Sequence, residues 1–264
     1  MVRMLRPVEY VVEVLRKACL ERKSRMFRIV CETWNDCGKG CTHFCQYCNV
    51  WKRFIPKLQK NPKVKRYRDG FTVRFFKEGL NKNFKDFDKS RGLVFIWYMG
   101  DWMCPAVKDE WIISILDVVR RNPQAEFLSC TKNPPRYLEL AEKYGWEIYP
   151  KNLWLGTTIE SNLPIADKYT KAPPVKERYE AMRKLEWEKK FLSIEPKMDC
   201  EPYGFAKWVK DMRIRIVEVG ADNYGNKLPE PKWWKVQSLL ELLNETCDLV
   251  IAKEGLYRLK KQNQ

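Results

Sequence analysis

The chain has 264 residues, of which 45% are apolar and 13% aromatic, so it is long enough and apolar enough to bury a substantial core. It carries 50 Lys and Arg residues, 34 Asp and Glu residues and a single histidine, His43. One histidine excludes a histidine-rich zinc hydrolase site and, away from that residue, any nucleophile–histidine triad.

The predicted elements alternate between helix and strand for most of the chain. An amphipathic helix is expected over 7–20, a buried strand over 27–32, then a cysteine-rich loop and an irregular basic segment over 52–91. Further strands are expected at 93–99, 126–131, 153–159, 190–195, 214–219 and 249–253, with helices at 109–121, 133–144, 174–187, 203–211 and 231–244. This alternation predicts one α/β domain over 1–264 with a parallel, barrel-like sheet, a lead-in at 1–26 and a basic insertion at 52–91.

Three closely spaced cysteines follow the first predicted strand. Cys41, Cys45 and Cys48 form a C-x3-C-x2-C run, and Tyr47 stands just before the last of them. Three thiolates hold three irons of a [4Fe–4S] cluster and leave the fourth iron open to a ligand that is not protein. Cys37, four residues upstream, leaves a closed four-thiolate zinc or iron–sulfur site as the alternative.

The cysteine run and several short motifs in the same order resemble the radical S-adenosylmethionine (SAM) superfamily. The similarity is closest to a phage- and mobile-element-associated family of radical SAM-like proteins and covers about residues 27–254. The motifs are Thr33-Trp-Asn, Met99-Gly-Asp101, Cys130-Thr-Lys-Asn-Pro134, Asn152-Leu-Trp-Leu-Gly156, Phe191-Leu-Ser-Ile-Glu-Pro196 and Val217-Glu-Val-Gly220. The resemblance implies a partial (β/α)6 TIM-like barrel, a [4Fe–4S] cluster on Cys41, Cys45 and Cys48, and SAM bound at the open iron and cleaved to a 5′-deoxyadenosyl radical.

Polar residues recur where the predicted strands end, which is where parallel barrels collect their reactive groups. By the resemblance, Tyr47 packs against the adenine of SAM, and Gly100 and Asp101 meet its amino group. The ends of the fourth and fifth barrel strands supply the remaining candidates for SAM, which are Thr157, Glu160, Ser193 and Glu195.

The basic segment 52–91 contains fourteen Lys and Arg residues against four Asp and Glu residues, with phenylalanines interleaved. Cations attract phosphates and aromatic rings stack on bases, so Lys63, Lys65, Arg66 and Arg68 are candidate nucleic-acid contacts. A solvated basic surface whose phenylalanines pack inward explains the same composition equally well.

Two functions follow from these observations. The first is a radical SAM enzyme that modifies or repairs a nucleic-acid base (in tRNA or DNA) or a nucleotide, with a peptide as the alternative substrate and a one-electron reductant such as ferredoxin or flavodoxin. The second is a non-catalytic nucleic-acid-binding module with a closed four-cysteine zinc or iron–sulfur site. No apolar run approaches the roughly 20 residues of a membrane helix. With no signal peptide evident, the ten cysteines are expected to be reduced thiols and metal ligands in the cytoplasm.

Overall fold

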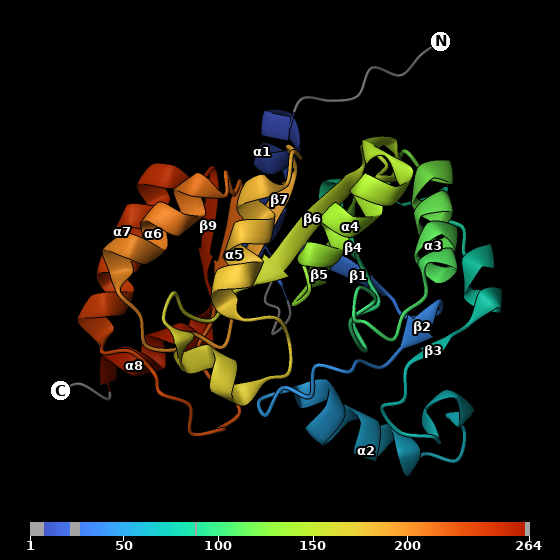
Figure 1. The fold of residues 1–264 in the computed structure, drawn as a ribbon, viewed down its shortest axis with the longest axis horizontal. Coiled ribbons are helices and arrows are strands. Elements are labelled where there is room, and N and C mark those ends of the chain that lie inside the picture. Colours follow the sequence, from blue (N-terminus) through green and yellow to red (C-terminus); the bar gives the residue numbers. More distant parts are fainter. Residues whose placement is uncertain (1–7, 22–26, 88, 262–264) are drawn as a thin grey trace.

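The computed structural model describes residues 8–21, 27–87 and 89–261. Its centre is one curled sheet of seven parallel strands in the order β1-β4-β5-β6-β7-β8-β9 (Figure 1). These strands are β1 (Val30–Trp34), β4 (Leu93–Ile96), β5 (Phe127–Thr131), β6 (Leu153–Thr158), β7 (Lys190–Ile194), β8 (Ile216–Val219) and β9 (Leu249–Ala252). The predicted partial barrel is confirmed.

Five helices cover the outer face of the sheet, because each crossover returns the chain to start the next parallel strand. They are α3 (Asp109–Arg121), α4 (Pro135–Tyr144), α5 (Val175–Lys184), α6 (Pro202–Asp211) and α7 (Trp233–Thr246). Alternate strand residues such as Val94, Leu155 and Val217 pack against them in the larger hydrophobic core. The other strand residues point into the barrel, where Phe95, Trp154 and Phe191 meet in a second core.

Helix α1 (Val8–Glu21) completes this inner core. Its apolar face, with Val8, Val12 and Leu15, packs against the strand residues that point inward. In Figure 1 it lies at the upper end of the sheet, whereas α2 (Ile55–Gln59) lies below the opposite end, where the parallel strands finish. Residues 1–7 and 22–26 of the predicted lead-in fall outside the described part of the chain.

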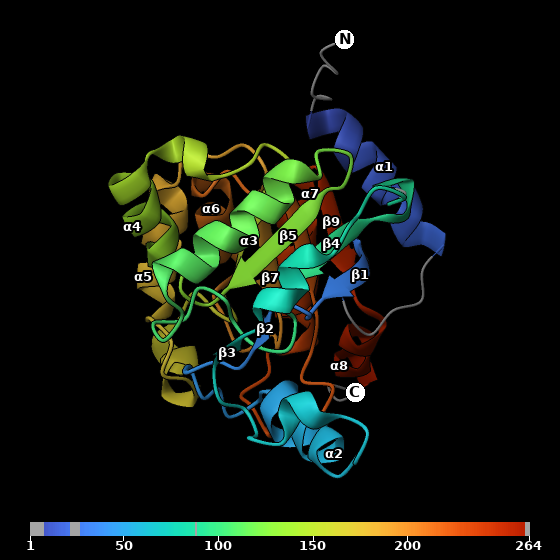
Figure 2. The same ribbon diagram turned by 90° about the vertical axis from the view of Figure 1, so that its right-hand side faces the viewer.

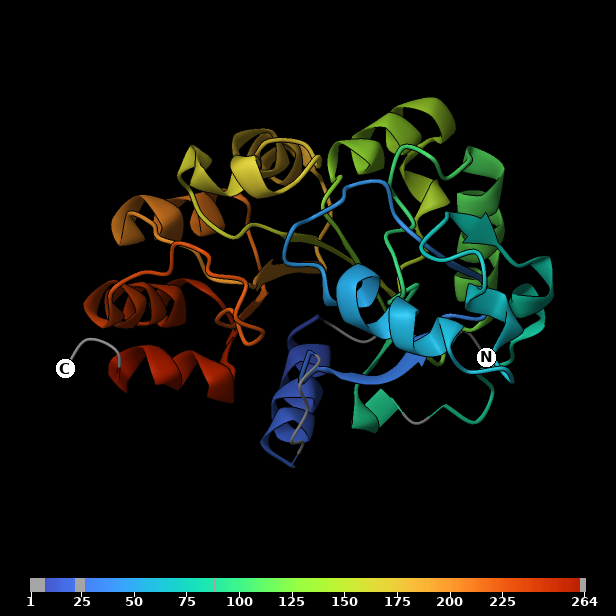
Figure 3. The same cartoon turned by 90° about the horizontal axis from the view of Figure 1, so that it is seen from below.

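The basic insertion folds into short elements near the carboxyl ends of the strands. The last turn, η4 (Lys89–Arg91), is the exception, since it lies beside α1 just before β4. Besides α2, the other elements are the π-helical turn η1 (Val50–Phe54), the 3-10 turns η2 (Lys65–Tyr67) and η3 (Lys77–Asn81), and β3 (Arg74–Phe75), which pairs antiparallel with β2 (Gly38–Lys39). Figure 2 shows this small sheet on the same side as α2, and Figure 3 looks onto α2 from below. The buried Lys39 ammonium contacts Asp69 and donates 2.8 Å to the Gly70 carbonyl, which ties the insertion to the cysteine loop.

The phenylalanines of the insertion pack inward, as one of the two interpretations expected. Phe84 is buried against Trp34, and Phe75 stacks on Trp111 with ring centroids 5.3 Å apart. The guanidinium carbon of Arg66 lies over the Phe76 ring, 4.5 Å from the centroid of that ring. These three rings therefore contact other side chains of the protein and are not free to stack on bases.

The remaining short elements are the 3-10 turns η5 (Trp146–Ile148), η6 (Pro164–Tyr169) and η7 (Glu254–Tyr257) and the last helix, α8 (Arg258–Lys261). Among the described residues, no helix is both long and apolar enough to cross a membrane.

Candidate functional site

The cysteine loop is docked on the end of β4 by backbone contacts. Gly40 N donates 3.0 Å to the Met99 carbonyl, and Asp101 N donates 3.1 Å to the Gly40 carbonyl. Gly40 has a φ of +87°, which favours glycine, and a Cβ on Gly100 would lie 2.1 Å from the Gly40 carbonyl oxygen. The two glycines therefore allow the loop and the strand end to approach.

Gly100→Ala is expected to detach the loop from β4. Since the contacting atom is backbone, relief of the overlap must move the chain, and the predicted metal ligands move with it. We expect a reduced metal content per chain, measured after anaerobic reconstitution, and a lower midpoint of thermal unfolding. Gly204→Ala on α6 is the control, because its φ is not left-handed and the atom nearest to a Cβ there is the end of the Glu201 side chain (2.7 Å), not backbone; equal losses in both variants would contradict the docking argument.

The three cysteines line a single cavity of about 250 Å³ at the carboxyl ends of the strands. Two thiols accept backbone hydrogen bonds, Cys41 Sγ from His43 N (3.3 Å) and Cys48 Sγ from Trp51 N (3.4 Å). Cys45 Sγ lies 3.2 Å from the Thr170 hydroxyl. Such N–H···S contacts stabilise thiolates and tune iron–sulfur clusters, so the donor set fits a cluster held by three cysteines.

The surroundings of the three thiols favour their protonated form. Burial raises the pKa of Cys45 and of Cys48, and a hydrogen bond with Cys104 together with burial raises the pKa of Cys41. A thiolate is required for metal binding, so loading the site releases protons.

Asp101 is a buried carboxylate beside Cys41. It accepts hydrogen bonds from the Thr131 hydroxyl (2.7 Å), Lys132 N (2.9 Å) and Met103 N (3.0 Å). His43 Nε2 lies 3.1 Å from Asp101 Oδ2, at ion-pair distance, although it is not aligned as a hydrogen bond. Burial would raise the pKa of Asp101, but the nearby His43 imidazole and the hydrogen-bond donors hold it below its ordinary value.

Cys41, His43 and Asp101 bring one potential ligand atom each to within 4.8 Å of the others. That set alone is compatible with a metal ion. However, the Asp101 oxygens already accept several protein hydrogen bonds, so Asp101 is better suited to orient the loop than to bind a metal.

A second buried charge cluster lies behind Tyr47. The Tyr47 hydroxyl donates to Glu160 Oε1 (2.6 Å), Lys132 Nζ donates to the same oxygen (2.7 Å), and Arg178 Nη1 donates to Glu160 Oε2 (3.0 Å). Burial would raise the pKa of Glu160, but the charges of Arg178 and Lys132 lower it to about 2. Two cations against one carboxylate leave a net positive charge beside Cys45, which favours an anionic group in the cavity.

A third group of charged side chains lies inside the barrel, where a lysine stands between two carboxylates. Lys253 Nζ donates 2.6 Å to Glu195 Oε2 and lies 3.9 Å from Glu218 Oε2. Burial raises the pKa of the fully enclosed Glu218 to about 7. Glu195 borders the cavity, so its charge is presented to a ligand with Lys253 fixed behind it.

Most, but not all, of the predicted site residues meet at this cavity. Those that line it are Cys41, Cys45, Cys48, Tyr47, Gly100, Asp101 and Glu195. Ser193 and Glu160 are buried and do not line it. Thr157 does not line the cavity either, because its side chain points to the other side of β6 and its hydroxyl donates 2.8 Å to the Thr131 carbonyl. The next residue, Thr158, lines the cavity in its place. The roles in SAM binding stay predictions.

The extra cysteines are distributed differently from the expectation. Cys37, the fourth thiol of the alternative closed site, is fully buried and does not line the cavity, and its Sγ lies 3.7 Å from the Trp34 carbonyl. Cys104, which the sequence analysis did not single out, hydrogen-bonds to Cys41. Cys130 lines the cavity from β5, with its Sγ 3.7 Å from the Thr158 hydroxyl. The only sequence signal for Cys104 is its position three residues after Asp101.

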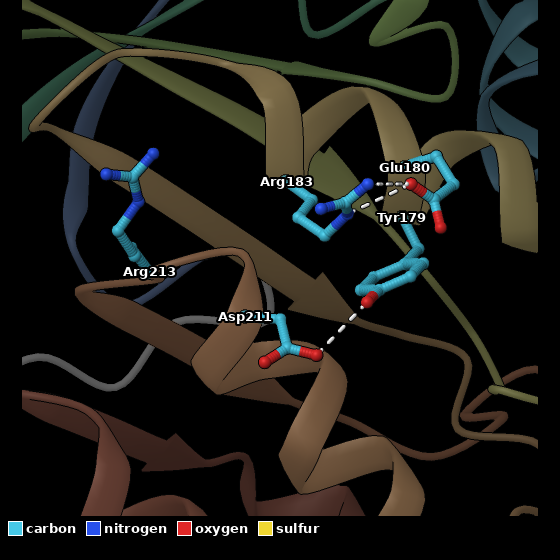
Figure 4. Close-up of a pocket in the computed structure, with 5 residues that line it drawn as sticks. All are labelled: Tyr179, Glu180, Arg183, Asp211 and Arg213. Carbon is cyan, nitrogen blue, oxygen red and sulfur yellow. Dashed lines mark hydrogen bonds and ion pairs between the residues drawn. The ribbon is translucent and has the colours of Figure 1, made fainter.

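A larger but more open hollow of about 480 Å³ lies between α5 and α6 on the outer layer (Figure 4). Its side chains pair with each other: the Tyr179 hydroxyl donates 3.1 Å to Asp211, and Arg183 bridges to Glu180 at 2.8 Å. It is lined by no cysteine, and both of its acidic side chains are paired, so the cysteine cavity is the better candidate despite its smaller volume.

Comparison with known proteins identifies the family to which the chain belongs. The family described as "Protein of unknown function (DUF5131)" matches residues 27–235, which is most of the chain. The chain belongs to this DUF5131 family. No curated protein matches the chain in sequence. A solved structure titled "spore photoproduct lyase", of a mutant, matches with a TM-score of 0.54 at 11% identity, covering 83% of this chain and 75% of that one.

The part of this DUF5131 chain that matches the family contains every residue that lines the cysteine cavity. The likeness to spore photoproduct lyase shows the fold alone at this level of identity. What the cavity does must therefore be argued from its own chemistry.

The predicted nucleic-acid contacts divide into two kinds. Lys63, Lys65 and Arg68 are exposed on the insertion, on either side of the buried Tyr67. Arg66 instead binds within the protein: its guanidinium donates 3.3 Å to Asp36 and covers Phe76. Arg66 is therefore a structural cation, and three of the four predicted residues remain available to a partner.

Proposed function

We propose that this chain is a radical SAM enzyme in which Cys41, Cys45 and Cys48 hold a [4Fe–4S] cluster at the mouth of the partial barrel. The observation that carries the proposal is that the three thiols of one C-x3-C-x2-C run line one cavity, while Cys37 lies outside it. When bound and reduced, the cluster supplies the electron that cleaves SAM, and the resulting radical abstracts hydrogen from a substrate.

The chain's own residues shape this cavity for that task. Phe27, Phe71, Phe95 and Tyr98 line it with aromatic surface and exclude water. The positive balance of Lys132 and Arg178 over Glu160 offsets the negative charge of a thiolate-bound cluster. Glu195 offers a fixed hydrogen-bond acceptor to an ammonium or N–H group of a ligand.

The alternative of a closed four-thiolate site built on Cys37 finds no support in this geometry. The Cys37 thiol hydrogen-bonds to backbone, and its charged neighbours are Asp36, Arg66 and Lys82, none of which borders the cavity. For that thiol to reach the cavity, the buried turn that carries it must refold.

The test is direct. The protein is reconstituted with iron and sulfide without oxygen, reduced with dithionite and mixed with SAM, and 5′-deoxyadenosine is quantified. We expect an iron- and sulfide-containing protein that forms 5′-deoxyadenosine. A colourless protein with one zinc ion and no product would overturn the proposal.

For the substrate we propose a nucleic-acid base or a nucleotide. The insertion is anchored beside the cavity, since Ile55 and Tyr67 pack on Met99 and, with them, on the cavity residues Phe71 and Tyr98. Its exposed cations therefore lie next to the cavity and can hold phosphates while a base enters. A base in a duplex must be flipped out to reach it, so single strands are favoured.

Replacing Lys63, Lys65 and Arg68 together with glutamine is expected to weaken single-stranded RNA or DNA binding and to flatten its salt dependence. Each lost phosphate contact lowers the slope of log K against log salt by about 0.7. The control is the triple glutamine variant of Lys176, Lys184 and Lys207, exposed on α5 and α6. An unchanged slope in the first variant, measured by fluorescence anisotropy, would remove nucleic acid from the proposal.

A further inference from the structure

An exposed aromatic and basic surface adjoins the cysteine loop. It consists of Phe44, Trp51, Lys52, Lys168 and Lys171, here called the loop-face patch. Phe44 is 44% and Trp51 37% exposed, and their rings meet edge to face with centroids 5.9 Å apart. Lys171 Nζ lies 5.4 Å from the Phe44 centroid, and Lys52 and Lys168 are exposed as well.

The patch is built from the same backbone that carries the cysteines. Phe44 is bonded to Cys45 and has a left-handed φ of 47°, which a bulky residue rarely adopts. Trp51 N donates to Cys48 Sγ at 3.4 Å. Lys171 N donates 2.7 Å to the His43 carbonyl, which fastens the segment with the lysines to the loop. The patch is thus coupled to two of the thiols by a covalent bond and a hydrogen bond.

None of the five patch residues lines the cavity. A molecule seated on the patch therefore lies outside the space where a substrate must react. A substrate has to bring its atoms into the cavity, but an electron donor only has to come close to the cluster. This geometry favours an electron donor over a substrate as the occupant.

The charge of the patch indicates the chemistry of that donor. Three of its members are lysines, and no acidic residue occurs between Cys41 and Arg53. The nearby Asp167 accepts a hydrogen bond from Val175 N at 2.8 Å, so it is tied into its own turn. A positive surface steers an acidic partner, and redox encounters are weak and need only a small interface, below about 1,200 Å².

We propose that the loop-face patch docks an acidic one-electron carrier protein of the flavodoxin or ferredoxin class, which reduces the cluster. This inference rests on the proposed function, since it requires the cluster. The carrier loses one electron and the cluster gains it; no bond forms or breaks and no proton moves.

The experiment compares the loaded protein with two variants, Lys168→Glu with Lys171→Glu, and Phe44→Asn with Trp51→Gln. Asparagine tolerates the left-handed φ at position 44. Iron content and thermal midpoint establish that each variant is folded and loaded. The dissociation constant for reduced flavodoxin is measured by calorimetry at two salt concentrations, and the loss of visible cluster absorbance gives the reduction rate by flavodoxin and by dithionite.

We expect the charge-reversal variant to bind flavodoxin at least about tenfold more weakly, with a smaller salt dependence, and to be reduced correspondingly more slowly by it. Reduction by dithionite, which needs no docking, should be unchanged. Unaltered flavodoxin affinity in both variants would overturn the inference, as would lost RNA binding in place of lost flavodoxin binding. Absent 5′-deoxyadenosine with dithionite in the parent protein would instead refute the proposed function, so the two failures are distinguishable.

Discussion

Replacing Cys41, Cys45 or Cys48 with alanine, one at a time, is expected to abolish cluster binding and 5′-deoxyadenosine formation. In the proposed cluster each thiolate would hold one iron, and the cysteine loop offers no further thiol that lines the cavity. Iron and sulfide content after anaerobic reconstitution is the primary measurement, and we expect less than about a tenth of the parent value, since loss of even a side chain that only supports a ligand weakens metal binding about 10- to 100-fold.

The matched controls are Cys37→Ala, Cys104→Ala and Cys130→Ala. Cys37 lies outside the cavity, Cys130 lines it from β5 and not from the cysteine loop, and Cys104 is fully buried and hydrogen-bonds to Cys41. All three variants should keep the cluster. Loss of iron in Cys104→Ala alone would identify a fourth thiolate that closes the site, and SAM would then have no iron to bind.

Glu160→Gln is expected to destabilise the fold by about 3–5 kcal/mol, because it leaves two buried cations without their counter-charge. Arg178 and Glu160 are both fully enclosed, and Lys132 is nearly so. The free energy of unfolding from urea titration checks this. The control is Glu180→Gln, which removes an exposed partner of Arg183 and should leave that free energy essentially unchanged.

The same carboxylate predicts an acid dependence. The pKa of Glu160 is lowered from 4.5 to about 2 in the folded chain, so its ionised form is favoured by folding. Its contribution to stability is fully present above about pH 4.5 and is lost as the pH falls toward 2. Glu160→Gln should flatten the fall in stability over this range, and an unchanged fall would assign it to other groups.

Much of the fold could be predicted because its signals are local. The helix over 109–121 has the predicted bounds, and the strands over 127–131 and 190–194 lie within one residue of prediction at each end. Short apolar runs closed by glycine, proline or polar residues mark buried parallel strands, and apolar residues at helical spacing mark the helices between them.

The phase of a strand could not be predicted in the same way. All six residues of β6 are buried, so no alternation of polar and apolar residues distinguishes Thr157 from Thr158. The side that faces the cavity is decided by the neighbouring strands, since Thr157 pairs with Leu192 and Thr158 with Ser193.

Contacts between distant segments were likewise invisible in the sequence. Glu160 was predicted to contact SAM, but its carboxylate accepts hydrogen bonds from Arg178 of α5 and from Lys132 at the end of β5. The sequence predicted that Arg66 is a surface cation that contacts nucleic acid, but its guanidinium pairs with Asp36 and covers the Phe76 ring. In both cases the partner lies far enough away along the chain that only the folded topology brings it close.

The placement of α1 restricts which molecules the barrel can process. Helix α1 closes one end of the barrel, because Val8, Val12 and Leu15 pack among the inward-pointing strand residues. Under the proposed function, reactants and products would enter and leave at the opposite end, where the cysteine loop lines the cavity. Under the same function, a polymeric substrate would not pass through the barrel; it would lie across the open end and present one protruding monomer to the cavity, while its other monomers stay outside.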